Sequence, residues 1–268
     1  MKGIIGAIAG DVIGSAYEFH PTRDYGFDLF TPKTTFTDDT VLTMANAQWL
    51  LEDESHSPET LVKIMQDMCH RYEWRGYGAR FVQWIVSSNP QPYGSFGNGS
   101  AMRVSPVGYY AKSLDEALEL AKISAEVTHN HPEGIKGAQA TAAAIFLARQ
   151  GKTKSEISTY VHDTFNYDLS RTLEEIRPDY TFDETCQRTV PEAITCFMEG
   201  KDYEDVIRLA VTLAADADTL AAIAGSIASA AMEVPNEIAQ RVISLLSEEF
   251  CTLLLRFNEM TAKREAAL

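Results

Sequence analysis

Apolar residues recur at intervals of three and four along almost the whole chain, whereas the period-two alternation of half-buried strands is almost absent. Short linkers with Pro or Gly stop signals separate the apolar stretches, and no composition seam or fixed-period repeat divides them. We therefore predict an all-α protein with one compact multi-helix domain over residues 1–268. The predicted helices cover residues 3–18, 39–52, 58–73, 77–87, 114–126, 132–150, 154–166, 187–199, 203–214, 219–232 and 236–261.

Two segments interrupt this helical pattern, residues 20–37 and residues 89–106. Both mix Gly, Pro and Asn with aromatic residues, which predicts long irregular loops. Loops of this length inside a compact domain are commonly functional.

The charge balance limits the partners of this chain. It has 38 acidic and 23 basic residues, and the formal net charge of -15 repels nucleic acids and anionic membranes. Asp11 interrupts the N-terminal apolar run well before signal-peptide length, and no apolar stretch approaches the roughly 18 residues of a membrane span. The four cysteines lack the spacing of a zinc site or a disulfide framework. We expect a cytoplasmic monomer with no membrane contact and no stable nucleic-acid binding.

Two acidic clusters lie at the starts of predicted helices. The first acidic cluster is residues 37–40 (Thr-Asp-Asp-Thr), and the second acidic cluster is residues 216–219 (Asp-Ala-Asp-Thr). Helix capping explains one carboxylate at each start, but each cluster has a surplus of acidic and hydroxyl oxygens. Magnesium and manganese prefer such oxygen ligands. If the two helix starts converge, four carboxylates and two threonine hydroxyls surround a volume suited to two cations.

This convergence depends on the predicted helices at 3–18 and 219–232, which are rich in Gly, Ala and Ser. Small side chains allow two helix backbones to approach closely, and close packing would bring the helix ends into one layer. Glu18, at the end of the first helix, would then point toward the two acidic clusters. An ordinary surface glutamate is the alternative interpretation.

Two further segments have the composition of ligand contacts. Residues 97–103 (Gly-Asn-Gly-Ser-Ala-Met-Arg) offer backbone N–H groups that can cradle a pyrophosphate, and Arg103 can add a charge-assisted bond. This segment is neither a Rossmann fingerprint nor a P-loop. His129 and His131 are two positions apart and do not share a helix face, which disfavours a zinc pair. Helix capping before Pro132 and ligand contact both remain open for the two histidines.

Taken together, the ordered motifs resemble those of the ADP-ribosylglycohydrolase family, which is related to dinitrogenase-reductase-activating glycohydrolase. The resemblance runs nearly end to end, and its strength lies in the order and spacing of the motifs. They are Gly6-x3-Gly10-Asp11-x2-Gly14 with Glu18, Phe36-Thr37-Asp38-Asp39-Thr40, Gly97-Asn98-Gly99-Ser100-Ala101-Met102-Arg103, Thr128-His129, Thr185-Cys186 before Val190-Pro191-Glu192-Ala193, and Asp216-x-Asp218-Thr219 before Ala221-Ala222-Ile223-Ala224-Gly225.

The resemblance implies an all-α fold with a central cleft that holds two Mg2+ ions, with Mn2+ as the other suitable ion. Its implied metal ligands are Thr37, Asp38, Asp39, Asp216, Asp218 and Thr219. Glu18 matches a family glutamate close to the metals, and we expect Glu18 or Asp39 to act as the catalytic base. The implied substrate-binding residues are Tyr93 and Phe96, expected to stack on adenine, with Gly97, Asn98, Gly99, Ser100, Met102, Arg103, His129 and His131.

The implied activity is hydrolysis of the glycosidic bond between ADP-ribose and an acceptor, such as arginine, on an ADP-ribosylated protein or a small conjugate. Two alternatives remain: a non-catalytic ADP-ribose sensor, and a hydrolase of an O-linked ester or a nucleobase conjugate. A histidine-dependent phosphohydrolase is disfavoured because His162-Asp163 is the only adjacent His-Asp pair. We expect residues 20–36 to form the acceptor end of the cleft.

One departure from the family pattern lies beside the second acidic cluster. The family commonly has Gly-Gly-Asp-(Ser/Thr)-Asp-(Ser/Thr), whereas this chain has Ala214-Ala215-Asp216-Ala217-Asp218-Thr219. The added methyl groups are expected to alter substrate fit or metal affinity.

Overall fold

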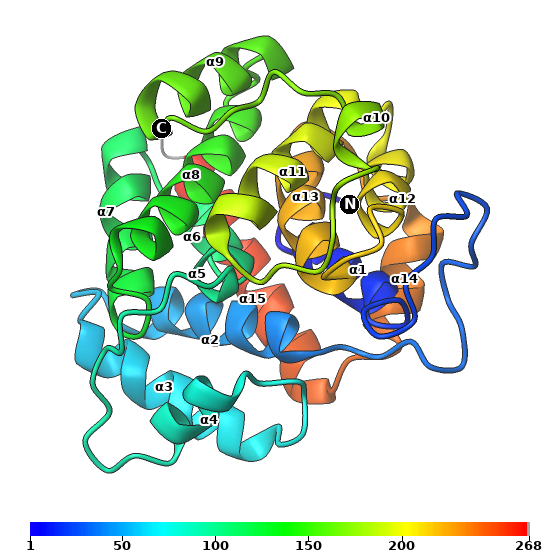
Figure 1. Ribbon diagram of the computed structural model, residues 1–268. Helices are drawn as coiled ribbons and strands as arrows, with labels where there is room; N and C mark the ends of the chain where they lie inside the picture. Colours follow the sequence, from blue (N-terminus) through cyan, green and yellow to red (C-terminus); the bar gives the residue numbers. More distant parts are fainter. Residues whose placement is uncertain (267–268) are drawn as a thin grey trace.

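Helices and their connecting loops make up the computed structural model, which describes residues 1–266 (Figure 1). Within these residues the only β-type pairing is an isolated bridge between Gly97 and Thr185, so the all-α prediction is confirmed. The helices are α1 (Ile5–Gly14), α2 (Asp38–Glu52), α3 (Pro58–Arg71), α4 (Ala79–Ile85), α5 (Gly99–Met102), α6 (Ser105–Tyr110), α7 (Leu114–Glu126), α8 (Pro132–Arg149), α9 (Lys154–Phe165), α10 (Leu173–Ile176), α11 (Cys186–Glu199), α12 (Tyr203–Val211), α13 (Ala217–Ala231), α14 (Asn236–Ile243) and α15 (Glu248–Glu265).

Helix α13 lies at the centre of the fold. It packs against α1, α8, α11 and α12 (Figure 1). All of its residues from Ala217 to Ala230 are buried. Such an apolar helix can be stable in water only when neighbours cover every face. One connected hydrophobic core extends from these helices to α2, α3 and α15, which makes the protein a single compact domain. No helix within residues 1–266 is long and apolar enough to cross a membrane.

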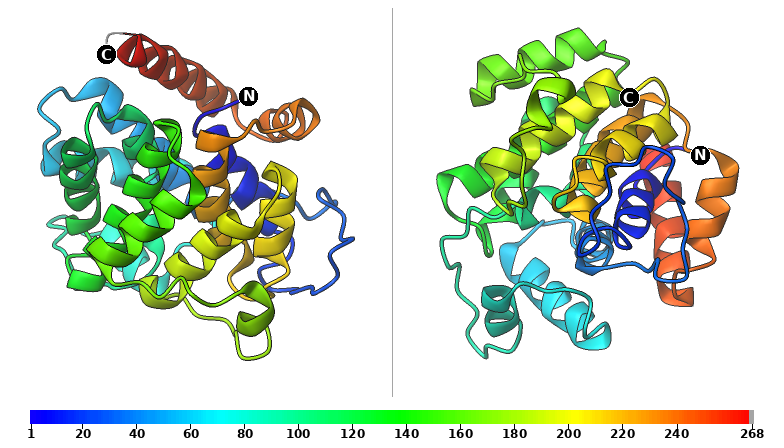
Figure 2. Two further views of the ribbon diagram at one scale, coloured as in Figure 1. Left: turned by 90° about the horizontal axis from the view of Figure 1, so that it is seen from above. Right: turned by 45° about the vertical axis from the view of Figure 1, so that its right-hand side comes forward.

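Helices α1 and α13 are in direct backbone contact, and both views in Figure 2 place them side by side. A Cβ atom on Gly10 would lie 2.0 Å from the carbonyl oxygen of Ala221, and one on Gly14 would lie 2.5 Å from the Cα atom of Asp218. No side chain fits at either position. The close packing predicted from the small residues is therefore confirmed, and it places the end of α1 against the first turn of α13.

Several parts of the predicted helix pattern were wrong in detail. The helix predicted at 3–18 ends at Gly14, so Glu18 lies beyond its end. The predicted loop at 89–106 contains α5 and the start of α6, and the single helix predicted at 236–261 is divided into α14 and α15. The division occurs where the Ser247 side chain accepts a hydrogen bond from Phe250 N and caps α15. The short helix α10 was missed, although Thr172 and Glu175 form a capping box at its start.

Candidate active site

One cleft brings the two acidic clusters together. Thr219 Oγ1 of the second cluster donates a hydrogen bond to Asp39 Oδ2 of the first at 3.3 Å. The cleft has a volume of about 310 Å³, which is within the range of small-ligand sites. The convergence predicted from the sequence is therefore confirmed. The carboxylates that line the cleft are Glu18, Asp38, Asp39, Glu184, Asp216 and Asp218.

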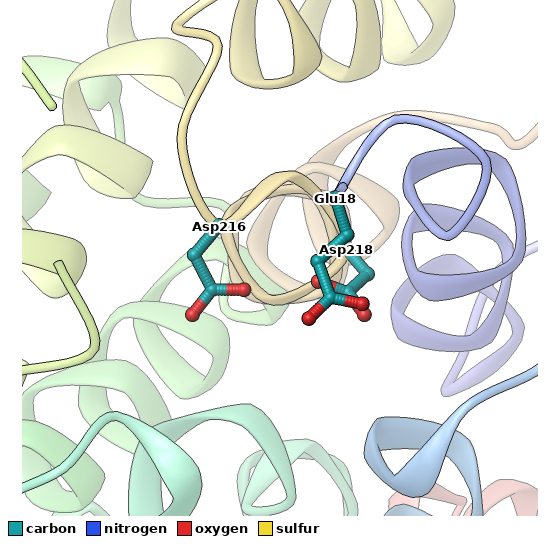
Figure 3. Close-up of side chains that lie close together, drawn as sticks. All are labelled: Glu18, Asp216 and Asp218. Carbon is teal, nitrogen blue, oxygen red and sulfur yellow. The ribbon is translucent and has the colours of Figure 1, made fainter. Parts of the chain in front are cut away.

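Glu18, Asp216 and Asp218 form a tight group of carboxylates in this cleft (Figure 3). One oxygen atom of each lies within 4.8 Å of the others. Glu18 follows the end of α1, while Asp216 and Asp218 lie at the start of α13, so the packing of these two helices sets their separation. Burial and the charge of Asp216 raise the pKa of Glu18 to about 7. Burial also raises the pKa of both aspartates.

The buried carboxylate of Asp11 holds the first acidic cluster in place. Its oxygens accept hydrogen bonds from Thr37 N at 3.0 Å, Thr37 Oγ1 at 2.7 Å and Thr40 N at 3.1 Å. The hydroxyl of Thr40 also donates to it. Asp11 belongs to α1, and Thr37 is the N-cap of α2. One side chain of α1 therefore fixes the start of α2 and the direction of the carboxylates that follow.

The donor set fits a hard divalent cation. The group consists of carboxylate and hydroxyl oxygens, and within residues 1–266 the buried Asp39 Oδ1 has no hydrogen-bond partner. Burial and the charge of Asp11 raise the pKa of Asp38 and Asp39 well above the usual range. Buried carboxylates that repel one another require a compensating proton or cation. An oxygen without a partner at this position is a suitable metal ligand.

Two arginines and a histidine also line the cleft. They are Arg80 of α4, Arg103 after α5 and His129 after α7. The Arg80 guanidinium lies 4.8 Å from the ring centre of Tyr93, which is also part of the lining. Burial, together with the charges of Arg103 and Arg80, lowers the pKa of His129 well below its usual value, so this imidazole is neutral at pH 7. The cleft therefore combines carboxylates with two guanidinium groups and a neutral imidazole.

Comparison with known proteins identifies the family. The sequence model of the family described as ADP-ribosylglycohydrolase matches residues 1–266. The chain belongs to the ADP-ribosylglycohydrolase family. A solved structure titled as an ADP-ribosylglycohydrolase-related protein complex superposes on this family member with a TM-score of 0.74 at 24% identity, covering 96% of both chains. At this identity the structural match shows the shared fold.

Curated relatives have more specific names. The ADP-ribosylhydrolase ARH3 of Homo sapiens is 32% identical over 190 residues, which are 57% of this chain and 50% of the relative. The ADP-ribosylarginine hydrolase Tri1 of Pseudomonas putida is 25% identical over 265 residues, covering 85% of this chain and 68% of the relative. This ADP-ribosylglycohydrolase family member thus spans about half the length of the ARH3 relative that it matches.

Most of the residues predicted for the site line the cleft. They are Glu18, Asp38, Asp39, Tyr93, Gly97, Asn98, Gly99, Met102, Arg103, His129, Asp216, Asp218 and Thr219. Asn98 has an additional contact, because its side-chain amide donates to Asp216 Oδ2 at 2.7 Å and to Thr189 Oγ1 at 3.1 Å. The segment 97–103 therefore also orients the second acidic cluster.

Four predicted residues do not line the cleft, namely Thr37, Phe96, Ser100 and His131. The hydroxyl of Thr37 donates a hydrogen bond to Asp11 and accepts one from the backbone amide of Asp39. Ser100 is fully buried and donates to the carbonyl oxygen of Gly134 at 2.6 Å. His131 Nδ1 accepts from Glu133 N and caps α8, so the capping interpretation applies to this histidine. Phe96 is 44% exposed and contacts the His131 ring.

Three expectations about the loops need correction. The amides of Gly97 and Asn98 already donate to Ser95 Oγ and the carbonyl oxygen of Glu184, so these two amides form no pyrophosphate cradle. Arg103 donates to oxygens of the protein itself. No residue of 20–36 lines the cleft. This segment instead packs on α12, where Arg208 donates to the carbonyl oxygens of Tyr25 and Phe27.

The sequence did not reveal two charged residues of the lining, Arg80 and Glu184. Glu184 directly precedes the Thr185-Cys186 motif, and this position could have been used to predict it as a site residue. Arg80 lies in α4 without a recognisable motif. Only the tertiary packing of α4 against α3 brings it to the cleft.

Proposed function

We propose that this protein is a metal-dependent hydrolase that cleaves the glycosidic bond between ADP-ribose and an acceptor such as arginine. The mixed lining of the cleft is the observation that carries the proposal, because six carboxylates share it with Arg80, Arg103 and His129. ADP-ribose has matching parts: a ribose whose hydroxyls suit an oxygen-rich metal site, and a diphosphate that suits a basic one. The names of the ARH3 and Tri1 relatives support this class of substrate.

Two Mg2+ ions, or Mn2+ ions, are the proposed cofactors. Asp38, Asp39, Asp216, Asp218 and Thr219 would hold them, because their oxygens line one cleft and Asp39 Oδ1 has no partner within residues 1–266. Bound ions of this type supply Lewis acidity and lower the pKa of bound water. Thr37 would contribute indirectly, by setting the start of α2.

Glu18 is the better candidate for the catalytic base. Its side chain is partly exposed in the cleft, and its pKa of about 7 matches proton transfer near neutral pH. Asp39 is buried, and its Oδ2 already accepts a hydrogen bond from Thr219. In the proposed mechanism Glu18 takes the proton from the attacking water. The surrounding carboxylates favour the positive charge that develops at the anomeric carbon.

The proposal is tested by measuring ADP-ribose release from ADP-ribosyl-arginine, ADP-ribosyl-serine, an ADP-ribosyl ester and a nucleobase conjugate. We expect turnover of at least one conjugate with Mg2+, and loss of turnover with EDTA or in Asp218→Ala. Glu18→Gln should lower kcat by about 10² to 10⁴-fold. Glu184→Gln makes the same chemical change on a second glutamate of the lining and should cost less.

Two results would contradict the proposal. Undiminished turnover in EDTA and in Asp218→Ala would exclude the metal mechanism. Calorimetric binding of ADP-ribose without turnover of any conjugate would instead identify the protein as an ADP-ribose sensor.

A further inference from the structure

Arg103 is a fully buried cation without an acidic partner. Its guanidinium donates to the carbonyl oxygens of Ser124 at 2.6 Å and Gly99 at 3.3 Å, and to Thr128 Oγ1 at 2.8 Å. Among residues 1–266 no carboxylate forms a salt bridge with it, and its Nε has no hydrogen-bond partner. Burial of an uncompensated charge is unfavourable. Hydrogen bonds to three neutral oxygens do not by themselves account for a buried charge at this position.

The hydroxyl group of Thr128 connects this cation to His129. Arg103 has donors only, so Thr128 Oγ1 must accept the hydrogen bond from the guanidinium. Thr128 is fully buried, and the only other hydrogen bond of its hydroxyl within the described residues joins it to His129 Nδ1 at 2.7 Å. The single hydroxyl hydrogen is satisfied only when it points at this nitrogen. Thr128 therefore donates, and His129 Nδ1 accepts.

An accepting Nδ1 places the ring proton of neutral His129 on Nε2. This nitrogen faces the glycines of the segment 97–103. A Cβ atom on Gly99 would lie 3.1 Å from Nε2, and one on Gly97 would lie 3.6 Å from it. Both glycines and His129 line the cleft, and within residues 1–266 Nε2 forms no hydrogen bond. The donor is thus presented to the space that a ligand would occupy.

We propose that Arg103, acting through Thr128, holds His129 as a neutral Nε2–H donor that recognises an acceptor oxygen of a phosphate group in the cleft. Arg103 and Thr128 are positioning residues, and His129 makes the contact. The ligand part of this inference rests on the proposed function, whereas the tautomer does not. A phosphate oxygen accepts hydrogen bonds without donating one, so a fixed donor matches it and an accepting imidazole nitrogen would repel it.

Nitrogen-15 NMR of the full chain, without ligand, tests the tautomer directly. We expect a non-protonated resonance for His129 Nδ1 and a protonated one for Nε2 at pH 7. Thr128→Val removes the donor and should redistribute the proton between the two nitrogens, whereas Thr128→Ser keeps the hydroxyl and should restore the wild-type spectrum. A proton on Nδ1 in the wild type, or a doubly protonated ring, would overturn the inference even if Thr128→Val fails to fold.

Calorimetry with ADP-ribose tests the ligand contact. We expect Thr128→Val to weaken binding by about 10-fold and Thr128→Ser to restore it, in line with the loss of one oriented hydrogen bond to a charged group. His129→Gln places an amide N–H donor near the position of Nε2 and should retain most of the affinity, while His129→Glu, which only accepts, should abolish it. Equal affinities in the glutamine and glutamate variants would overturn the contact. Absence of binding to the wild type would refute the proposed function and leave the NMR result to decide the tautomer.

Discussion

Thr219 Oγ1 donates to Asp39 Oδ2 at 3.3 Å, although the two residues are 180 positions apart in the sequence. Each lies in the first turn of its own helix, so the contact joins the starts of α2 and α13. The other oxygen of Asp39 is buried and has no hydrogen-bond partner within residues 1–266. The two acidic clusters therefore act as one group of charges, and a change of charge in one cluster will alter the electrostatics of the other.

Asp39→Asn replaces one buried carboxyl of this group with a neutral amide. In EDTA we expect the free energy of unfolding to rise by about 1 to 3 kcal/mol, because the amide neither repels Asp11 and Asp38 nor requires a compensating proton. The stabilisation by Mg2+ should be lost. Urea unfolding with EDTA and with Mg2+ measures both effects. For the measurement in EDTA, Thr219→Val is the control, since it removes the hydrogen bond but keeps every charge and should destabilise by about 1 kcal/mol. Full Mg2+ stabilisation of Asp39→Asn would exclude Asp39 as a ligand.

The metal-free protein should lose stability as the pH rises. The folded state raises the pKa of Glu18 from 4.5 to about 7, so it holds this proton more tightly than the unfolded state does. The resulting contribution is complete below pH 4.5 and is lost as the pH rises through about 7. We expect the Tm in EDTA to fall between pH 5 and pH 8.

Two controls accompany the pH profile. Glu18→Gln should make it less steep, and Mg2+ should raise the Tm more at pH 8 than at pH 5, because ligands bind metal in their deprotonated form. A Tm in EDTA that rises toward pH 8 would contradict the predicted pKa shift of Glu18.

Ala214→Gly should stabilise the protein. Ala214 has a φ of 60°, in the left-handed region where a non-glycine residue costs about 1 to 2 kcal/mol. Glycine removes this strain but adds unfolded-state entropy worth about 0.5 to 1 kcal/mol, which leaves a net gain of about 0.5 to 1 kcal/mol. Ala215→Gly is the matched control, because Ala215 is buried and has no positive φ, and it should lower the free energy of unfolding. A loss of stability in both variants would contradict the strain argument.

Gly10→Ala should destabilise the protein severely. Its methyl group would meet the carbonyl oxygen of Ala221 at 2.0 Å, and backbone atoms cannot move aside as a flexible side chain does. We expect a loss of about 3 kcal/mol or more in urea unfolding. Gly78→Ala introduces the same methyl group where nothing lies within 4 Å, and it should change stability by less than about 1 kcal/mol. Similar effects of the two substitutions would show that α1 and α13 can separate at little cost.

The features that the sequence predicted correctly depend on local patterns of residues. Helical periodicity located most of the helices, and the small residues near Gly10 predicted the backbone contact with α13. The surplus of acidic groups predicted the cleft because carboxylates beyond those needed for capping require another explanation. Each of these inferences depends on residues within one or two turns of a helix.

Features that depend on tertiary contacts were not visible. Arg103 is a residue type that commonly binds phosphate groups, yet its guanidinium donates hydrogen bonds to Ser124, Thr128 and Gly99. Arg80 enters the cleft only because α4 packs against α3. The boundary between α14 and α15 could have been predicted from the sequence, since Ser247 is followed by Glu248 and Glu249 in the pattern of a helix start.

The backbone contact between Gly10 and Ala221 also limits when the cleft can form during biosynthesis. A ribosome completes α1 long before α13 exists, so the glycine face of α1 remains without its partner while most of the chain is made. Glu18 cannot meet Asp216 and Asp218 until that partner has emerged. The three carboxylates can therefore come together only after α13 has been synthesised, late in translation.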